Sequence, residues 1–198
     1  MTKGDETRRQ IIEKAAPIFN QHGFTGSSLA ELMQATGLQK GGIYRHFKSK
    51  EELALEAFDY ALTTVKNLRF AGVDPGMPSI DQLKKFIENF VECRSSIPGG
   101  CPLWNTAIDC DDGNPVLRER ALAALQNWMT RLANIIERGI QNQEIDPEVE
   151  PEGLAALLIS SLEGALVMKR LTNRTEPLKQ VAQYLNEILD SHASKQSK

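Results

Sequence analysis

Apolar residues recur three and four positions apart along nearly the whole chain, which is the spacing of amphipathic α-helices. Glycine and proline clusters interrupt this spacing at 72–78, 98–100, 112–115 and 146–151. No segment has the alternation of a strand. The pattern predicts an all-α fold of about nine helices, with a three-helix module before a larger helical bundle. The expected helices are 7–22, 28–36, 39–47, 50–70, 80–97, 102–111, 116–143, 152–171 and 176–191.

The stretch 24–50 is the most informative part of the chain. Ser28 and Glu31 have the spacing of a capping box, which starts a helix. Gly37 tolerates the positive φ that ends a helix. Ile43 and Phe47, four residues apart, give the next short helix one buried stripe. Two short helices joined by a tight turn form a helix-turn-helix.

Polar and glycine residues remain on the open side of this second helix, where side chains can donate to phosphates and base edges. Lys48 and Lys50 flank the start of the next helix, an end suited to a phosphate. We expect Lys40, Tyr44, His46 and Lys48 to bind phosphates and Gln39, Gly42 and Arg45 to face bases. The full set of candidate DNA contacts is Thr25, Ser28, Gln39, Lys40, Gly41, Gly42, Tyr44, Arg45, His46 and Lys48. The alternative is that such paired helices serve structure alone.

The string KGGIYRHFKSKEEL at 40–53 resembles the DNA-binding domain of the tetracycline-repressor (TetR) family. This resemblance implies a homodimeric transcriptional regulator, most often a repressor, that binds a palindromic operator in double-stranded DNA. Met33 and Thr36 depart from the alanines usual in that family. Pro17 lies inside the first helix and is expected to kink it. Residues 1–50 would form the DNA-binding domain and 51–198 the regulatory and dimerisation domain.

Charge is divided unevenly along the chain. Residues 1–50 carry eight lysines and arginines against four acidic residues, a net +4, whereas the remainder has 15 against 22, a net −7. The positive part would attract phosphate. An odd count of three cysteines, with no signal peptide and no membrane span, predicts a cytoplasmic protein without membrane contact. Three scattered histidines, with no metal-ligand spacing or phosphate-binding loop, argue against an enzyme, a metal site or a cofactor.

The last two helices are the expected subunit interface. The first of them is apolar almost all round, and small residues in it permit close approach. One recognition helix reads few base pairs, so a two-fold dimer in a four-helix bundle is favoured. Two ordinary core helices are the alternative. The expected contacts are Leu154, Leu158, Leu162, Leu166, Leu178, Val181, Leu185 and Ile188.

A regulator needs a second site for a small-molecule effector, and aromatic residues of the middle helices are candidates. Aromatic residues at helical spacing are more often plain core than part of a ligand pocket. The candidate pocket residues are Phe86, Phe90, Cys93, Cys101, Trp104, Asn105, Ile108, Trp128 and Leu132.

Cys101 precedes Pro102 at the start of a short helix, whose dipole favours a thiolate. The segment 100–110 also resembles a branch of the family that senses electrophiles through cysteine. Two alternatives therefore stay open: a switch by Cys101 modification, with Cys93 or Cys110 as a resolving partner, or an architectural DNA-binding protein without effector. A small buried cysteine with no chemistry is the plainer interpretation of Cys101.

Overall fold

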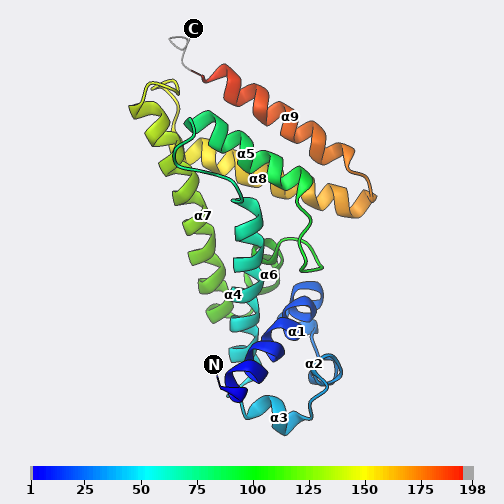
Figure 1. Ribbon diagram of the computed structural model, residues 1–198. Coiled ribbons are helices and arrows are strands. Elements are labelled where there is room, and N and C mark those ends of the chain that lie inside the picture. Colours follow the sequence, from blue (N-terminus) through cyan, green and yellow to red (C-terminus); the bar gives the residue numbers. More distant parts are fainter. Residues whose placement is uncertain (1, 194–198) are drawn as a thin grey trace. The chain divides into compact units, whose positions relative to one another are not determined.

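The computed structural model describes residues 2–193 of the chain (Figure 1). Nine α-helices cover these residues, and β structure among them is limited to an isolated bridge between Ile145 and Ala193. The fold is therefore all-α, as the hydrophobic spacing predicts. Among the described helices, none combines the length and the apolar character needed to span a bilayer.

The chain forms two compact units. The first contains the residues up to Lys66 together with Ser95–Ala124, and the second contains Asn67–Arg94 and the chain from Leu125 onward. Two helices, α4 (Lys50–Arg69) and α7 (Pro115–Gln141), begin in the first unit and end in the second. The first unit also holds α1 (Lys3–Gly26), α2 (Leu29–Thr36), α3 (Lys40–Tyr44) and α6 (Pro102–Cys110). The second holds α5 (Ser79–Glu92), α8 (Pro151–Thr172) and α9 (Glu176–Ser191).

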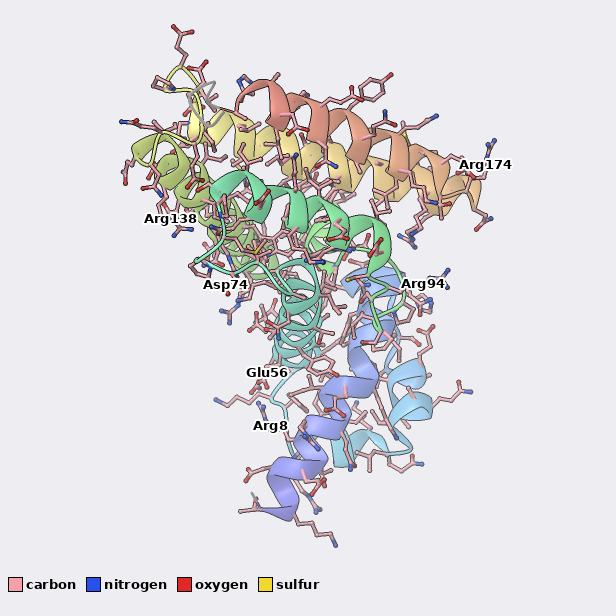
Figure 2. The ribbon with its side chains drawn as sticks, turned by 45° about the horizontal axis from the view of Figure 1, so that its top comes forward. Arg8, Glu56, Asp74, Arg94, Arg138 and Arg174 are labelled. Atoms are coloured by element: carbon pink, nitrogen blue, oxygen red, sulfur yellow. The ribbon has the colours of Figure 1, made fainter. Side chains whose placement is uncertain are left out.

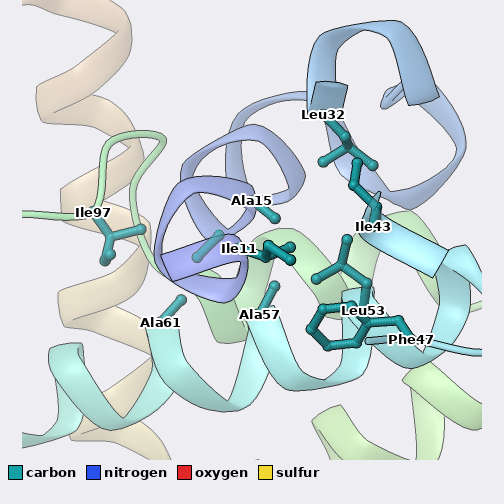
Figure 3. Packing of buried hydrophobic residues seen from close by; sticks show 10 residues of the cluster. Ile11, Ala15, Leu32, Ile43, Phe47, Leu53, Ala57, Ala61 and Ile97 are labelled. Carbon is teal, nitrogen blue, oxygen red and sulfur yellow. The ribbon is translucent and has the colours of Figure 1, made fainter. Parts of the chain in front are cut away.

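The core of the first unit joins its helices around α1. Ile11 and Ala15 of α1 meet Leu32 of α2, and Ile43 and Phe47 close the same cluster (Figure 3). Residues of α4 and the segment before α6 complete it: Leu53, Ala57, Ala61 and Ile97. Their burial supplies the hydrophobic free energy that fixes α2 and α3 on α1.

The core of the second unit is aromatic. The Phe86 ring lies 4.9 Å from that of Phe70 and 5.2 Å from that of Phe90, while the Trp128 ring meets Phe70 edge-on at 6.1 Å. Helices α8 and α9 pack on each other and on α5. The spacing of apolar residues therefore marks plain core in this unit.

The break in the first helix falls at Gly23 and not at Pro17. Pro17 lies inside α1 without non-helical backbone, whereas Gly23 has φ 73°. A Cβ on Gly23 would lie 2.4 Å from Oδ1 of Asp109, so that position requires glycine. The break in the α1 backbone is therefore set by a contact with Asp109, far along the chain, and not by the proline.

The helix expected at 80–97 also ends early. It stops at Glu92, with Cys93 as an extended C-cap. Ile97 leaves the helix and joins the core of the first unit, where it is 5% exposed. Tertiary burial thus ends a helix that its local spacing would continue.

Candidate DNA-binding surface

The start of α2 is fixed by the predicted capping box. Ser28 Oγ accepts from the Glu31 amide at 3.2 Å, and the Ser28 amide donates to the Glu31 carboxylate at 2.7 Å. These hydrogen bonds lower the pKa of Glu31. At the other end Gly37 has φ 73° and its amide donates to Met33 O at 2.9 Å. Hydrogen bonds therefore fix both ends of α2, and the second of them starts the turn toward α3.

Helix α3 presents one buried and one exposed face. Ile43 and Phe47 are each 1% exposed, whereas Lys40, Gly41 and Arg45 lie in solvent. The helix ends at Tyr44, so Arg45, His46 and Phe47 belong to the turn after it and not to the helix as expected. Gln39 and Lys48 are also exposed. The structure thus leaves most of the predicted contacts exposed, chiefly in or next to a single short helix.

Some of the predicted contacts point elsewhere. A Cβ on Gly42 would meet Leu38 at 3.3 Å, whereas nothing lies within 4 Å of one on Gly41. The missing side chain of Gly42 therefore allows packing inside the protein, and only Gly41 keeps the predicted open approach. Tyr44 and His46 are half-buried. Thr25 is exposed at the end of α1, as is Ser28.

The start of α4 holds its own donors. The Lys48 amide donates to Glu52 Oε2 at 2.6 Å, and the Glu52 amide donates to Ser49 Oγ at 3.0 Å. Lys50 turns inward, with Nζ 4.6 Å from the centroid of the Phe24 ring and donating to Phe24 O. Burial lowers the pKa of Lys50. The exposed side chain of Lys48 remains available to a phosphate. The side chain of Lys50 is held by Phe24, so the expectation that it flanks a phosphate site was wrong.

Arg8 is a positioning residue that sequence reasoning missed. Its guanidinium pairs with the carboxylate of Glu56 on α4, and Cζ lies 4.6 Å from the centroid of the Phe47 ring (Figure 2). The hydrogen bond to Glu56 raises the pKa of Arg8. Arg8 thereby joins α1, α4 and the end of the α3 segment. A pair 48 residues apart leaves no local signal in the sequence.

A polar contact holds α6 against the end of α1. Asn20 Nδ2 donates to Pro98 O at 2.7 Å, and Asn105 Nδ2 donates to Asn20 O at 2.9 Å. Asp109 Oδ2 accepts from the Phe24 amide at 2.7 Å. A cavity of about 20 Å³ beside these groups has room for roughly one water. The side-chain amide of Asn105, which was predicted to line an effector pocket, thus binds the end of α1.

The rest of the predicted effector pocket does not form one described cavity. Phe86, Phe90, Trp128 and Leu132 are fully buried in the second unit. Four others belong to the first unit, among which Ile108 is 69% exposed: Cys101, Trp104, Asn105 and Ile108. Cys93 is half-buried after α5. The aromatic spacing that suggested a pocket reflects packing.

The predicted dimer contacts are mostly buried inside one chain. Five of them are at most 7% exposed: Leu154, Leu158, Leu162, Leu178 and Leu185. They cannot also face a partner, and the choice of these five was wrong. Leu166, Val181 and Ile188 are half-buried. The exposed apolar residues of α8 and α9 are different ones: Leu157, Val167, Met168, Leu171 and Tyr184.

Comparison with known proteins identifies the family. The model of the DNA-binding domain, "Bacterial regulatory proteins, tetR family", matches residues 11–57, and "Tetracyclin repressor-like, C-terminal domain" matches residues 79–185. The chain belongs to the TetR family. A TetR regulator from Chloroflexus aurantiacus J-10-FL is 40% identical, with TM-score 0.92 over 98% of each chain. The family is one of transcriptional regulators and not of enzymes, as the sequence predicts.

Two further relatives are more distant. The transcriptional repressor DhaR of Mycobacterium sp. (strain GP1) is 24% identical over 92% of this chain and 91% of its own. A cysteine mutant of the TetR-family regulator CifR, solved with a 26-bp double-strand operator DNA, is 21% identical. Its TM-score is 0.79, over 90% of this chain and 94% of that one. As a member of the TetR family, the chain is a DNA-binding transcriptional regulator.

Proposed function

We propose that this TetR-family regulator is a cytoplasmic homodimeric repressor that binds a palindromic operator and leaves it when a small-molecule effector binds the C-terminal part. The observation that carries the proposal is the segment formed by α3 and the turn after it, in which Ile43 and Phe47 are buried while Lys40, Gly41 and Arg45 lie in solvent. Support comes from the name of DhaR, a repressor, and from the operator complex of CifR. Residues 1–50 supply the DNA-binding domain in this proposal, and 51–198 the rest.

The proposal is tested with the promoter region upstream of the regulator's own gene, since such regulators commonly control neighbouring transcription units. Purified protein at low ionic strength should retard a fragment of that region in a gel and protect a two-fold symmetric site from nuclease. An unrelated fragment of equal length is the control. Equal retention of both fragments, with no protected site, would favour an architectural DNA-binding protein.

Lys48 and Arg45 are assigned different roles at the operator. Lys48→Ala should weaken binding to all duplexes about equally and reduce the slope of log K against log salt by roughly one charge per subunit. Arg45→Ala should lose roughly 1–3 kcal/mol on the operator and little on random DNA, because Arg45 is assigned to base edges. Fluorescence anisotropy with operator and scrambled duplexes across a salt series measures both.

A matched control for that comparison is Arg118→Ala, an exposed arginine of α7 outside the proposed contacts. It should leave operator affinity and salt dependence close to wild type. If Arg45→Ala and Lys48→Ala lost affinity equally on operator and scrambled DNA, the division between base and phosphate contacts would be wrong.

The second way to switch the regulator is modification of Cys101. This residue is the N-cap of α6 and 4% exposed, directly after the turn that Asn20 holds. Because the sulfur is buried, an adduct on it would fit only if this turn moved away. Cys110 is a poor resolving partner, because it lies nine residues later at the other end of α6, which places the two backbone positions about 13 Å apart along the helix axis.

The two cysteines of α6 are expected to differ in their response to an electrophile. Burial, followed by the Asp109 carboxylate, raises the pKa of Cys110 to about 11, so its thiolate is scarce at pH 7–8. N-ethylmaleimide should release operator from wild type and from Cys110→Ser, but not from Cys101→Ser. Mass spectrometry of the folded protein locates the adduct. Release from Cys101→Ser as from wild type would leave a small-molecule effector as the switch.

A further inference from the structure

A groove of about 420 Å³ opens along one face of α7 in the second unit. This volume is in the range of small-molecule sites. The residues of α7 that line it recur every three or four positions and are mostly polar or basic: Asn127, Thr130, Arg131, Asn134, Ile135 and Arg138. Opposite them lie Val73 and Pro75, which precede α5, and Gln82 of α5. None of these residues belongs to the DNA-binding surface.

The charge of the groove comes from two arginines. No acidic residue lines it, and neither Arg131 nor Arg138 forms an ion pair with any residue the structure describes. Asp74 lies between two lining residues, but its Oδ1 accepts from the Gly76 amide at 2.8 Å within its own turn. The groove is therefore a local excess of two positive charges in a chain of net charge −3.

Both guanidinium groups are held by uncharged partners. Cζ of Arg131 lies 3.8 Å from the centroid of the buried Phe70 ring. Nη2 of Arg138, labelled in Figure 2, donates to Gln82 Oε1 at 3.4 Å. Gln82 is 2% exposed and its Nε2 donates to Met77 O at 2.8 Å, which fixes the amide in place. The remaining N–H donors of each guanidinium have no protein acceptor among the described residues.

Neither guanidinium charge is neutralised by a carboxylate among the described residues. Partial loss of hydration against the Phe70 ring lowers the pKa of Arg131, while its side chain stays exposed to solvent and to a ligand. An anion in the groove would accept charge-assisted hydrogen bonds from a guanidinium whose position is already set. Val73, Pro75 and Ile135 offer apolar contact for the carbon skeleton of such a ligand.

We propose that the α7 groove binds a small organic anion, whose carboxylate or phosphate oxygens lie against Arg131 and Arg138. Seven residues separate the two arginines by about 10 Å along the helix, a span suited to a ligand with more than one anionic group. The proposal goes beyond the function proposed above and does not depend on operator binding.

The test uses the full chain with inorganic phosphate and with citrate as probes. Each is titrated by isothermal calorimetry at constant ionic strength set with sodium chloride, and thermal unfolding is followed in parallel. Both probes should bind saturably and raise the unfolding temperature above the chloride baseline. The double variant Arg131→Gln/Arg138→Gln should bind both probes at least about tenfold more weakly. Loss of one charge-assisted hydrogen bond is enough to raise Kd by about that factor.

Arg118→Gln, an exposed arginine of α7 in the first unit, is the matched control and should bind as wild type does. If loss of the Phe70 contact prevents folding of the double variant, Arg138→Gln alone should still lose affinity and Arg131→Lys should retain most of it. Equal binding by wild type and variants, or no saturation beyond chloride, would overturn the proposal. So would weaker, less salt-dependent duplex binding by the double variant, which would assign these charges to DNA.

Discussion

Replacing Phe47 by alanine is expected to destabilise the first unit by about 3–5 kcal/mol, the usual cost of truncating a buried phenylalanine. Phe47 is 1% exposed, packs in the cluster of α1, α2 and α4, and lies beneath the Arg8 guanidinium. Its loss leaves a cavity and removes a cation–π contact at once. Because a small unit has only about 5–15 kcal/mol to lose, operator binding should fall with stability.

The chain offers a direct probe of this loss. One of its two tryptophans, Trp104, lies in the first unit and the other, Trp128, in the second. In a Trp128→Phe background, urea unfolding followed by fluorescence reports the first unit alone. Phe47→Leu is the control and should cost less than about 1.5 kcal/mol, since it refills most of the volume. An unchanged midpoint for Phe47→Ala, with lost DNA affinity, would show that Phe47 contacts DNA instead.

Local chemistry made the helix-turn-helix predictable. The capping box of Ser28 and Glu31, the helix end at Gly37 and the buried pair Ile43 and Phe47 each depend on residues only three or four positions apart, and the structure contains all three. The position of Cys101 as the N-cap of α6 followed from Pro102 in the same way. Capping and turn preferences depend on neighbours in the sequence, so one chain contains the information they need.

Contacts between distant segments account for what the sequence did not predict. The break at Gly23 depends on Asp109, and the orientation of Phe47 on Arg8 and Glu56. Nothing near Pro17 in the sequence indicates that the α1 backbone remains helical there. The groove along α7 leaves no signal in the sequence either, because exposed polar residues are common on helices and the residues opposite them are distant in sequence.

The wrong choice of dimer contacts on α8 has a specific cause. An almost wholly apolar helix gives no contrast between its faces, so periodicity cannot say which leucines face the core. Leu158 is fully buried, whereas Leu157, its neighbour, is 42% exposed. One residue of rotation, about 100°, separates a core position from a surface position. The corrected surface of α8 still carries small residues, since Ser160 and Gly164 are exposed between Leu157 and Met168.

Charging this exposed face should convert the proposed dimer to a folded monomer. Leu157 and Met168 are eleven residues, or about three turns, apart and lie on one side of α8. Leu157→Glu/Met168→Glu would place four carboxylates in a two-fold interface, where burial without partners is strongly unfavourable. Sedimentation velocity should give the monomer mass. Operator affinity should fall about 10²-fold or more, because a monomer loses the linkage between two half-sites.

Two exposed apolar residues of α7 provide the matched control for that double substitution. Val116 is 44% exposed and Leu122 is 49% exposed, close to the exposure of the substituted pair, but both lie in the first unit. Val116→Glu/Leu122→Glu should remain dimeric and keep its operator affinity. Circular dichroism of both variants should match wild type, which separates loss of association from loss of folding. If Leu157→Glu/Met168→Glu stayed dimeric with wild-type affinity, the subunits must associate through a surface other than this face of α8.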